Sequence, residues 1–181
     1  MLYAPDRYVA ALRFAAERHI TQRMPDSELP YVVHVTSVTA ELVAALDETP
    51  EVDADLAIAC ALLHDTIEDA HVSYDDLAER FGIPVADGVQ ALSKNALLPK
   101  AEQMAESLRR IQAQPHAIWM VKLADRITNL APPPTRWSVD KRRRYRIEAL
   151  AIADALGSAS PALETRLRAR IAAYDTNVEA S

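Results

Sequence analysis

The stretch ALLHDTIEDA, residues 61–70, begins as a buried helix would and becomes acidic within one turn. Two leucines are followed directly by His64 and Asp65, and then by Glu68 and Asp69. A solvated helix end would explain the acidic residues alone, whereas a metal site would also explain the imidazole. Three carboxylates this close repel one another unless a cation or a proton relieves the repulsion. A divalent ion would supply that relief.

If the stretch is one continuous helix, residues four apart share a face. His64 then lines up with Glu68, and Asp65 lines up with Asp69, so both stripes face one cavity. A short motif of this kind is weak evidence by itself, because acidic helix ends are common. The metal interpretation therefore needs further ligands elsewhere in the chain.

Two other polar residues interrupt apolar helical rows. In YVVHVTSV, residues 31–38, His34 lies on one stripe with Tyr31 and Val38, where a hydrogen-bonded core histidine is the alternative to a ligand. In IWMVKLADRITNL, residues 118–130, Asp125 lies on the apolar stripe, one turn before Asn129. Burying a carboxylate is costly unless a cation or strong donors lie nearby. Asp125 is therefore a candidate ligand.

His34, His64, Asp65 and Asp125 together form a mixed nitrogen and oxygen ligand set. Such a set suits a six-coordinate first-row ion with open water positions, such as Mn²⁺, better than a closed structural zinc site. An ion of this kind lowers the pKa of bound water and supplies a nucleophile near neutral pH. We therefore expect one Mn²⁺ per chain and hydrolysis of a phosphate ester or anhydride.

The remaining sequence predicts an all-α fold. The 181 residues contain only three glycines and few aromatics, and half are hydrophobic, which favours helices over sheets. Helices are expected over residues 6–20, 31–46, 85–93, 100–112, 115–130, 139–156 and 161–173. Another helix, capped by Asp53, is expected to carry the stretch 61–70, and a short one is expected from Ser73 to Arg80, ended by Gly82. The run APPPTRW, residues 131–137, must be a loop, because three prolines cannot continue a helix. We predict a single compact domain over residues 1–181, a bundle of about eight to ten helices, with the motifs in residues 22–145 and C-terminal helices over residues 139–175.

Composition excludes several classes of partner. Cys60 is the only cysteine, so no internal disulfide can form, which fits a reducing cytoplasm. The formal charge of −6 argues against a nucleic acid polymer as partner. No apolar run approaches the roughly 20 residues that span a bilayer, and the N-terminus lacks the pattern of a signal peptide. A cytoplasmic protein is expected, and its oligomeric state, a homodimer included, stays open.

The order of the candidate ligands resembles the HD-domain metal phosphohydrolases. More narrowly, HDTIED followed by RFG and VKLADRITNL is similar to the hydrolase domain of the RelA/SpoT alarmone enzymes, over about residues 22–145. We expect no separate synthetase domain of the kind that the long bifunctional members carry, so the chain resembles a small alarmone hydrolase. The resemblance implies that His34, His64, Asp65 and Asp125 bind Mn²⁺ and that Glu68 and Asp69 activate or orient the attacking water. Family members remove the 3′-pyrophosphate from guanosine tetra- or pentaphosphate, so a purine alarmone is the expected substrate.

Substrate contacts are implied at five positions. Arg23, Asn129 and Tyr145 match positions near the nucleotide in the family. Lys94 and Lys100 flank the apolar loop SKNALLPK, where either could neutralise a diphosphate. Arg126 and the basic run KRRRYR, residues 141–146, are expected to be solvated helix residues.

Two departures from the family leave the substrate open. Met24 stands where many relatives carry a lysine or arginine, and the proline loop differs from that of the long enzymes. (p)ppApp therefore stands beside (p)ppGpp as a candidate, and a nucleotide phosphatase acting on a substrate such as NADPH is the alternative enzyme. A non-catalytic nucleotide-sensing module is the alternative of another class. Degenerate hydrolase domains usually lose metal ligands or the acidic pair, and this sequence keeps both.

Overall fold

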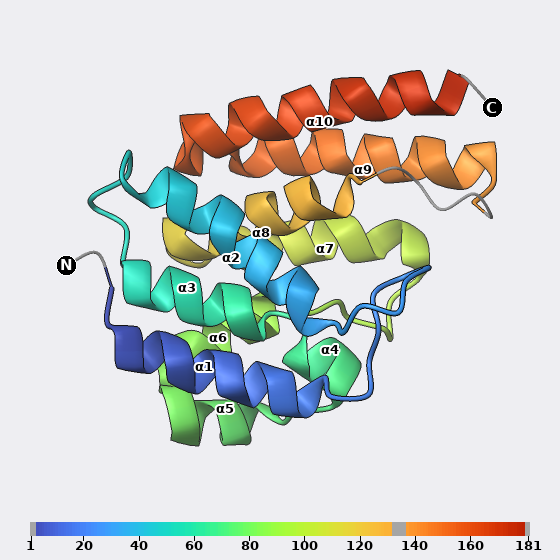
Figure 1. The fold of residues 1–181 in the computed structure, drawn as a ribbon. Coiled ribbons are helices and arrows are strands. Elements are labelled where there is room, and N and C mark those ends of the chain that lie inside the picture. The colour runs from blue at the N-terminus through green and yellow to red at the C-terminus, as the bar shows by residue number, and fades with distance from the viewer. Residues whose placement is uncertain (1–2, 132–136, 180–181) are drawn as a thin grey trace.

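All regular secondary structure is helical in the part that the computed structural model describes, residues 3–131 and 137–179 (Figure 1). Those residues form ten α-helices and one 3₁₀-helix. In chain order they are α1 (Pro5–Arg18), α2 (Val32–Leu46), α3 (Ala54–Leu63), α4 (Thr66–Ala70), α5 (Tyr74–Phe81), α6 (Ile83–Leu92), α7 (Lys100–Gln112), α8 (His116–Asn129), α9 (Val139–Leu156), η1 (Gly157–Ala159) and α10 (Pro161–Glu179). The described residues contain no β-strand, only an isolated bridge between Arg23 and Pro30. The predicted all-α fold is confirmed.

Most helix bounds agree with the sequence prediction. Helices α7 and α9 have the predicted bounds, and α10 continues beyond residue 173 to Glu179. The Asp53 side chain caps α3 by accepting a bond from the backbone of Leu56, and Ser73 caps α5 in the same way. Gly82 joins α5 to α6 with a φ of 90°, a backbone conformation that favours glycine. Of the predicted proline loop, residues 132–136 lie outside the described residues.

Helices α2, α3 and α8 pack against one another at the centre of the bundle. Leu42 of α2, Leu62 of α3 and Leu123 of α8 are all fully buried there. Helices α9 and α10 lie side by side along one edge of the molecule, and α1, α5 and α6 cover the opposite edge (Figure 1). None of the described helices is long and apolar enough to cross a membrane. Two of the predicted ligands, His34 and Asp125, lie on α2 and α8, and His64 directly follows α3.

The stretch 61–70 is not one continuous helix, so that prediction is wrong. Helix α3 ends at Leu63, and the short helix α4 begins at Thr66. The hydroxyl of Thr66 donates to the carbonyl of Leu63 at 2.7 Å, and Nδ1 of His64 donates to the carbonyl of Ala61 at 2.9 Å. In a continuing helix these two carbonyls would accept from backbone N–H groups four residues on, so the side chains replace helical bonds.

Candidate functional site

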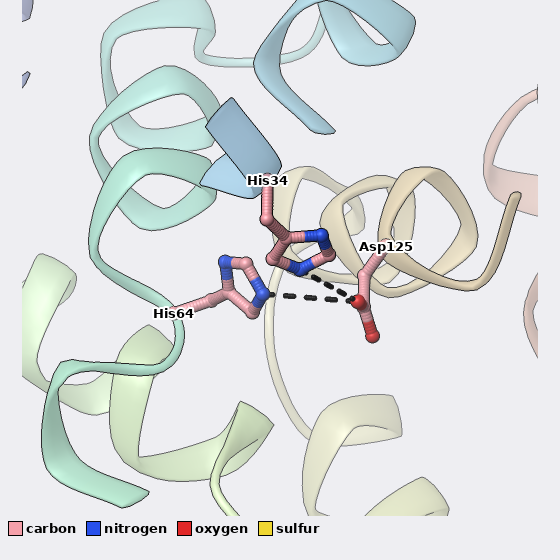
Figure 2. Close-up of side chains that lie close together, drawn as sticks. All are labelled: His34, His64 and Asp125. Carbon is pink, nitrogen blue, oxygen red and sulfur yellow. Dashed lines mark ion pairs between the residues drawn. The ribbon is translucent and has the colours of Figure 1, made fainter. Parts of the chain in front are cut away.

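Three side chains from separate parts of the chain meet where the start of α2, the end of α3 and α8 come together (Figure 2). His34 comes from the first turn of α2, His64 directly follows α3, and Asp125 belongs to α8. Asp125 Oδ1 lies 3.5 Å from His34 Nε2 and 3.7 Å from His64 Nε2. Ligands held at about 2.1 Å from one ion lie roughly 3–4 Å from one another, so the spacing fits a single metal ion.

The carboxylate of Asp125 is buried and strongly held. The exposed fractions of His34, His64 and Asp125 are only 4%, 4% and 6%. Lys122 donates to Asp125 Oδ2 at 3.0 Å, and Asn129 donates to Oδ1 at 2.5 Å. Burial by itself raises the pKa of Asp125, but the charge of Lys122 and the bond from His34 together hold this pKa well below its usual range. Asp125 is therefore ionised, as a metal ligand must be.

The ring of His64 is oriented by the backbone. Because Nδ1 donates to the carbonyl of Ala61, Nε2 is the nitrogen that faces Asp125 (Figure 2). Among the described residues, buried Nε2 has no hydrogen-bond partner of suitable geometry, although Asp65 Oδ2 lies 2.9 Å away. A ring nitrogen left over in this way, with the other fixed on a carbonyl, is typical of a metal-ligating histidine. Burial lowers the pKa of His64, but the charges of Asp65 and Asp125 outweigh burial and raise it to about 9.

Asp65 reaches the same cluster because the helix breaks beside it. Its Oδ2 lies 2.9 Å from His64 Nε2 and 3.7 Å from His34 Nε2. The hydroxyl of Tyr31 donates to the same oxygen at 2.5 Å. Burial raises the pKa of Asp65, but His64 and the bond from Tyr31 bring it below its usual range. Neighbouring residues of a continuous helix do not face one point, so the end of α3 at Leu63 is what lets residues 64 and 65 act together.

The acidic pair lies on α4, and each carboxylate is held by a different loop. Lys94 bonds Glu68 twice, through its ammonium to Oε1 and its backbone N–H to Oε2, each at 3.0 Å. Gln22 donates its side-chain amide to Asp69 Oδ2 at 2.9 Å. The predicted alignment of His64 with Glu68 on one helix is absent, because His64 lies outside α4.

A cavity of about 380 Å³ opens beside His34. It is lined by Met24, Tyr31, Asn129, Trp137, Tyr145 and Tyr174, among others. Asn129 and Tyr145, two of the predicted substrate residues, therefore share this cavity with a residue of the cluster. The Trp137 and Tyr145 rings meet edge to face at 5.2 Å. Aromatic walls around a volume of this size suit a planar ligand such as a nucleobase.

Arg126 lies behind the aromatic wall and is buried, so the prediction of a solvated residue is wrong. Its exposed fraction is 4%, and its guanidinium lies 4.2 Å from the centre of the Tyr145 ring. An ion pair of 3.7 Å joins it to Glu148. In the basic run 141–146, Arg142 is also buried. Burial raises the pKa of Tyr145 to about 12, against the opposing charge of Arg126, so this wall of the cavity is a neutral phenol.

Lys94 and Lys100 line a hollow of about 50 Å³ together with Lys122. Lys122 also bonds Asp125, so the hollow borders the cluster. Glu148 also lines the hollow, so three amines and one carboxylate give it a net positive charge, which suits a phosphate group. No sequence motif singled out Lys122, although it lies three residues before Asp125 on α8, a spacing that brings side chains together.

Arg23, a predicted substrate residue, is not among the described residues that line the cavity, whereas Trp137, for which no role was predicted, is one of them. Arg23 is exposed on the loop before α2, where its guanidinium donates to the carbonyls of Ile20 and Gln22 at 3.3 Å each. It is absent from the described walls of the cavity and of the lysine hollow. Trp137 lines the cavity, but nothing in its sequence surroundings distinguishes it from a loop aromatic.

The fold and the cluster define a class of protein: an all-helical domain with a buried site for a divalent ion, made of two histidines and a carboxylate. The sequence matches the HD domain family over residues 11–158. The chain belongs to this family of metal-dependent phosphohydrolases. The family resemblance that the motifs carry is confirmed.

Within this family, the chain is similar to several named hydrolases and to one solved structure. The chain is 33% identical over 162 residues to the guanosine-3′,5′-bis(diphosphate) 3′-pyrophosphohydrolase MESH1 of Danio rerio, which covers 87% of this chain and 88% of that protein. It is 33% identical over 140 residues to the guanosine-3′,5′-bis(diphosphate) 3′-pyrophosphohydrolase of Aquifex aeolicus, covering 76% of this chain but only 19% of that one. The solved structure of a metazoan ortholog of SpoT that hydrolyses ppGpp superposes with a TM-score of 0.77 at 28% identity, covering 91% of this chain and 93% of that one.

Proposed function

We propose that the protein is a Mn²⁺-dependent pyrophosphohydrolase that removes the 3′-pyrophosphate of (p)ppGpp or of a related purine alarmone such as (p)ppApp. The observation that carries this proposal is the meeting of His34, His64 and Asp125 between an aromatic cavity and a hollow lined by lysines. The activity in the names of the relatives supports it. We further propose one HD hydrolase domain over residues 1–181, since the buried apolar side chains form a single cluster. A cytoplasmic location is part of the proposal, because Cys60 is a free, buried thiol.

The donor set fits a divalent ion. His64 Nε2 is buried and faces two carboxylates, Asp65 Oδ2 at 2.9 Å and Asp125 Oδ1 at 3.7 Å, and Asp125 is ionised. His34, His64 and Asp125 would hold the ion, with Asp65 as a fourth ligand. Mixed nitrogen and oxygen donors with open water positions suit a six-coordinate first-row ion such as Mn²⁺. When bound, the ion supplies positive charge at the phosphate oxygens and lowers the pKa of a water.

Glu68 and Asp69 would orient the attacking water and take up its proton. The two carboxylates differ in their surroundings, since Glu68 pairs with the Lys94 ammonium and Asp69 bonds the neutral amide of Gln22. Both lie on α4, which starts directly after Asp65. A base of this kind must reach the proton within hydrogen-bonding distance, and the attachment of each carboxylate to a loop holds it in place.

The substrate would lie across the cluster. Its purine and ribose would occupy the aromatic cavity, where Trp137 and Tyr145 offer faces for stacking and Asn129 offers an amide. Its 3′-pyrophosphate would reach the cluster and face Lys94 and Lys100, whose charges stabilise the departing diphosphate. Met24 contributes a thioether rather than a cation to the cavity wall, so base stacking and not charge would select the purine.

The test uses purified protein with Mn²⁺ and three substrates, ppGpp, ppApp and NADPH, and identifies the product. Release of pyrophosphate from ppGpp or ppApp, abolished in His64→Ala, is the expected result. His116→Ala, which removes an exposed histidine outside the cluster, is the matched control. Release of orthophosphate from NADPH alone would instead identify a nucleotide phosphatase. Tight nucleotide binding without turnover would identify a sensing module.

A further inference from the structure

The loop between α1 and α2 carries a chain of polar contacts that ends at Asp69. His19 Nδ1 lies 2.6 Å from Gln22 Oε1, and Gln22 Nε2 lies 2.9 Å from Asp69 Oδ2. The direction of the chain follows from chemistry, because an ionised carboxylate only accepts hydrogen bonds. Gln22 must therefore present its amide nitrogen to Asp69 and its oxygen to His19, whose Nδ1 carries the proton.

His19 is a fixed anchor for this chain. It ends α1, its exposed fraction is 2%, and its ring lies 5.0 Å from that of Tyr31. Its Nε2 is buried without a hydrogen-bond partner among the described residues. Buried polar atoms are nearly always paired, and in the described structure His19 makes its one side-chain hydrogen bond with Gln22. That bond sets the direction of the Gln22 amide.

The backbone of Gln22 is held from both sides. Its N–H donates to the carbonyl of His19 at 3.0 Å, and its carbonyl accepts from the N–H of Tyr31 at 3.1 Å. Tyr31 in turn donates its hydroxyl to Asp65. One loop thus fixes two carboxylates, one in the ion cluster and one in the acidic pair.

We infer that Gln22 is a positioning residue that holds Asp69 in its working orientation, with His19 setting the direction of the Gln22 amide. The inference rests on the proposed function, in which Asp69 takes part in handling the proton of the attacking water. Asp69 is exposed on a helix of five residues, so without Gln22 its side chain would rotate freely. The bond occupies Oδ2 and leaves Oδ1 to the water. A misplacement of about 1 Å in a catalytic group costs up to about 100-fold in rate.

A double-variant cycle tests the inference through activity. Gln22→Leu is expected to lower kcat by about ten- to 100-fold while changing KM less than about twofold, and Asp69→Asn is expected to lower kcat further. The decisive result is the double variant, which should be no slower than Asp69→Asn alone, because Gln22 acts only through Asp69. Gln112→Leu, which removes an exposed amide that bonds the carbonyl of Ala155, is the control and should keep wild-type kcat. Losses that multiply in the double variant, or a wild-type kcat in Gln22→Leu, would overturn the inference.

A measurement without substrate separates this inference from the proposed function. In a ¹H–¹⁵N spectrum, the Gln22 side-chain amide, assigned by its loss in Gln22→Leu, should show one proton shifted downfield and protected from exchange. His19→Phe and Asp69→Asn should each return this resonance toward the position of exposed glutamines. A Gln22 amide that already resembles exposed glutamines in the wild type would overturn the inference. Absence of any hydrolysis, with the shifted resonance present, would refute only the proposed function.

Discussion

The raised pKa of His64 makes ion binding depend on pH. Without an ion, Asp65 and Asp125 stabilise the imidazolium and raise its pKa, against burial, to about 9. A metal ion requires the neutral ring. At pH 7, which is about two units below the pKa of His64, binding must therefore remove a proton from the ring. That removal costs about 3 kcal/mol, or roughly 100-fold in Kd. We predict that the Kd for Mn²⁺ falls about tenfold for each pH unit between about pH 6 and pH 8 and becomes constant above about pH 9.

Calorimetry in buffers of different ionisation enthalpy measures the proton directly. At pH 7 the wild type should release close to one proton for each ion bound. His64→Ala should bind the ion weakly or not at all, and His116→Ala should behave as the wild type. A Kd that stays constant from about pH 6 to pH 8, with the same heat in every buffer, would refute this coupling between His64 and the ion.

Three further predictions concern stability. The pKa of His64 is raised above its unfolded value, so His64 stabilises the folded protein fully below about pH 6.5, and this stabilisation is lost as pH rises through about 9. Urea unfolding of the metal-free protein should show this loss. Unfolding with saturating Mn²⁺ should not. Tyr31→Phe removes a bond to the carboxylate of Asp65 and should lower the free energy of unfolding by about 2 kcal/mol and weaken Mn²⁺ binding. Gly88→Ala would place a Cβ 2.5 Å from Ile118 Cδ1 and should destabilise the fold by about 1–3 kcal/mol without changing the Kd for Mn²⁺.

Each of these has a matched control or a contradicting outcome. Tyr74→Phe removes a comparable hydroxyl bond of 2.8 Å, to Asp87, away from the cluster, and should leave Mn²⁺ binding unchanged. A Tyr31→Phe variant that binds Mn²⁺ as tightly as Tyr74→Phe would contradict the role of Tyr31. A Gly88→Ala variant as stable as the wild type would show that the core can yield at this position. An equal loss of stability with and without Mn²⁺ above pH 7 would contradict the part assigned to His64.

Helix periodicity and capping chemistry predicted most of the architecture. The bounds of α7 and α9 follow from apolar spacing, and Asp53 and Ser73 cap α3 and α5 as their residue types predict. The buried stripe of α8 correctly marked Asp125 as a carboxylate facing the core. These predictions succeed because they depend on local spacing and on the cost of burying a charge.

The failures concern contacts that apolar periodicity does not report. The break between α3 and α4 depends on side chains of His64 and Thr66 that take over backbone carbonyls, and short-range periodicity cannot distinguish this from a continuing helix. Arg126 is buried because Tyr145 and Glu148 of α9 cover it, although nothing within α8 indicates a partner. Local bonds from side chains to the backbone decided the first case, and packing against α9 decided the second.

The proposed function requires that one divalent ion is bound where α2, α3 and α8 meet. Anomalous scattering from crystals soaked in Mn²⁺, recorded on both sides of the manganese absorption edge, tests it most directly. One strong peak per chain is expected within bonding distance of His34 Nε2, His64 Nε2 and Asp125. No peak there, or a peak only at surface carboxylates, would contradict it.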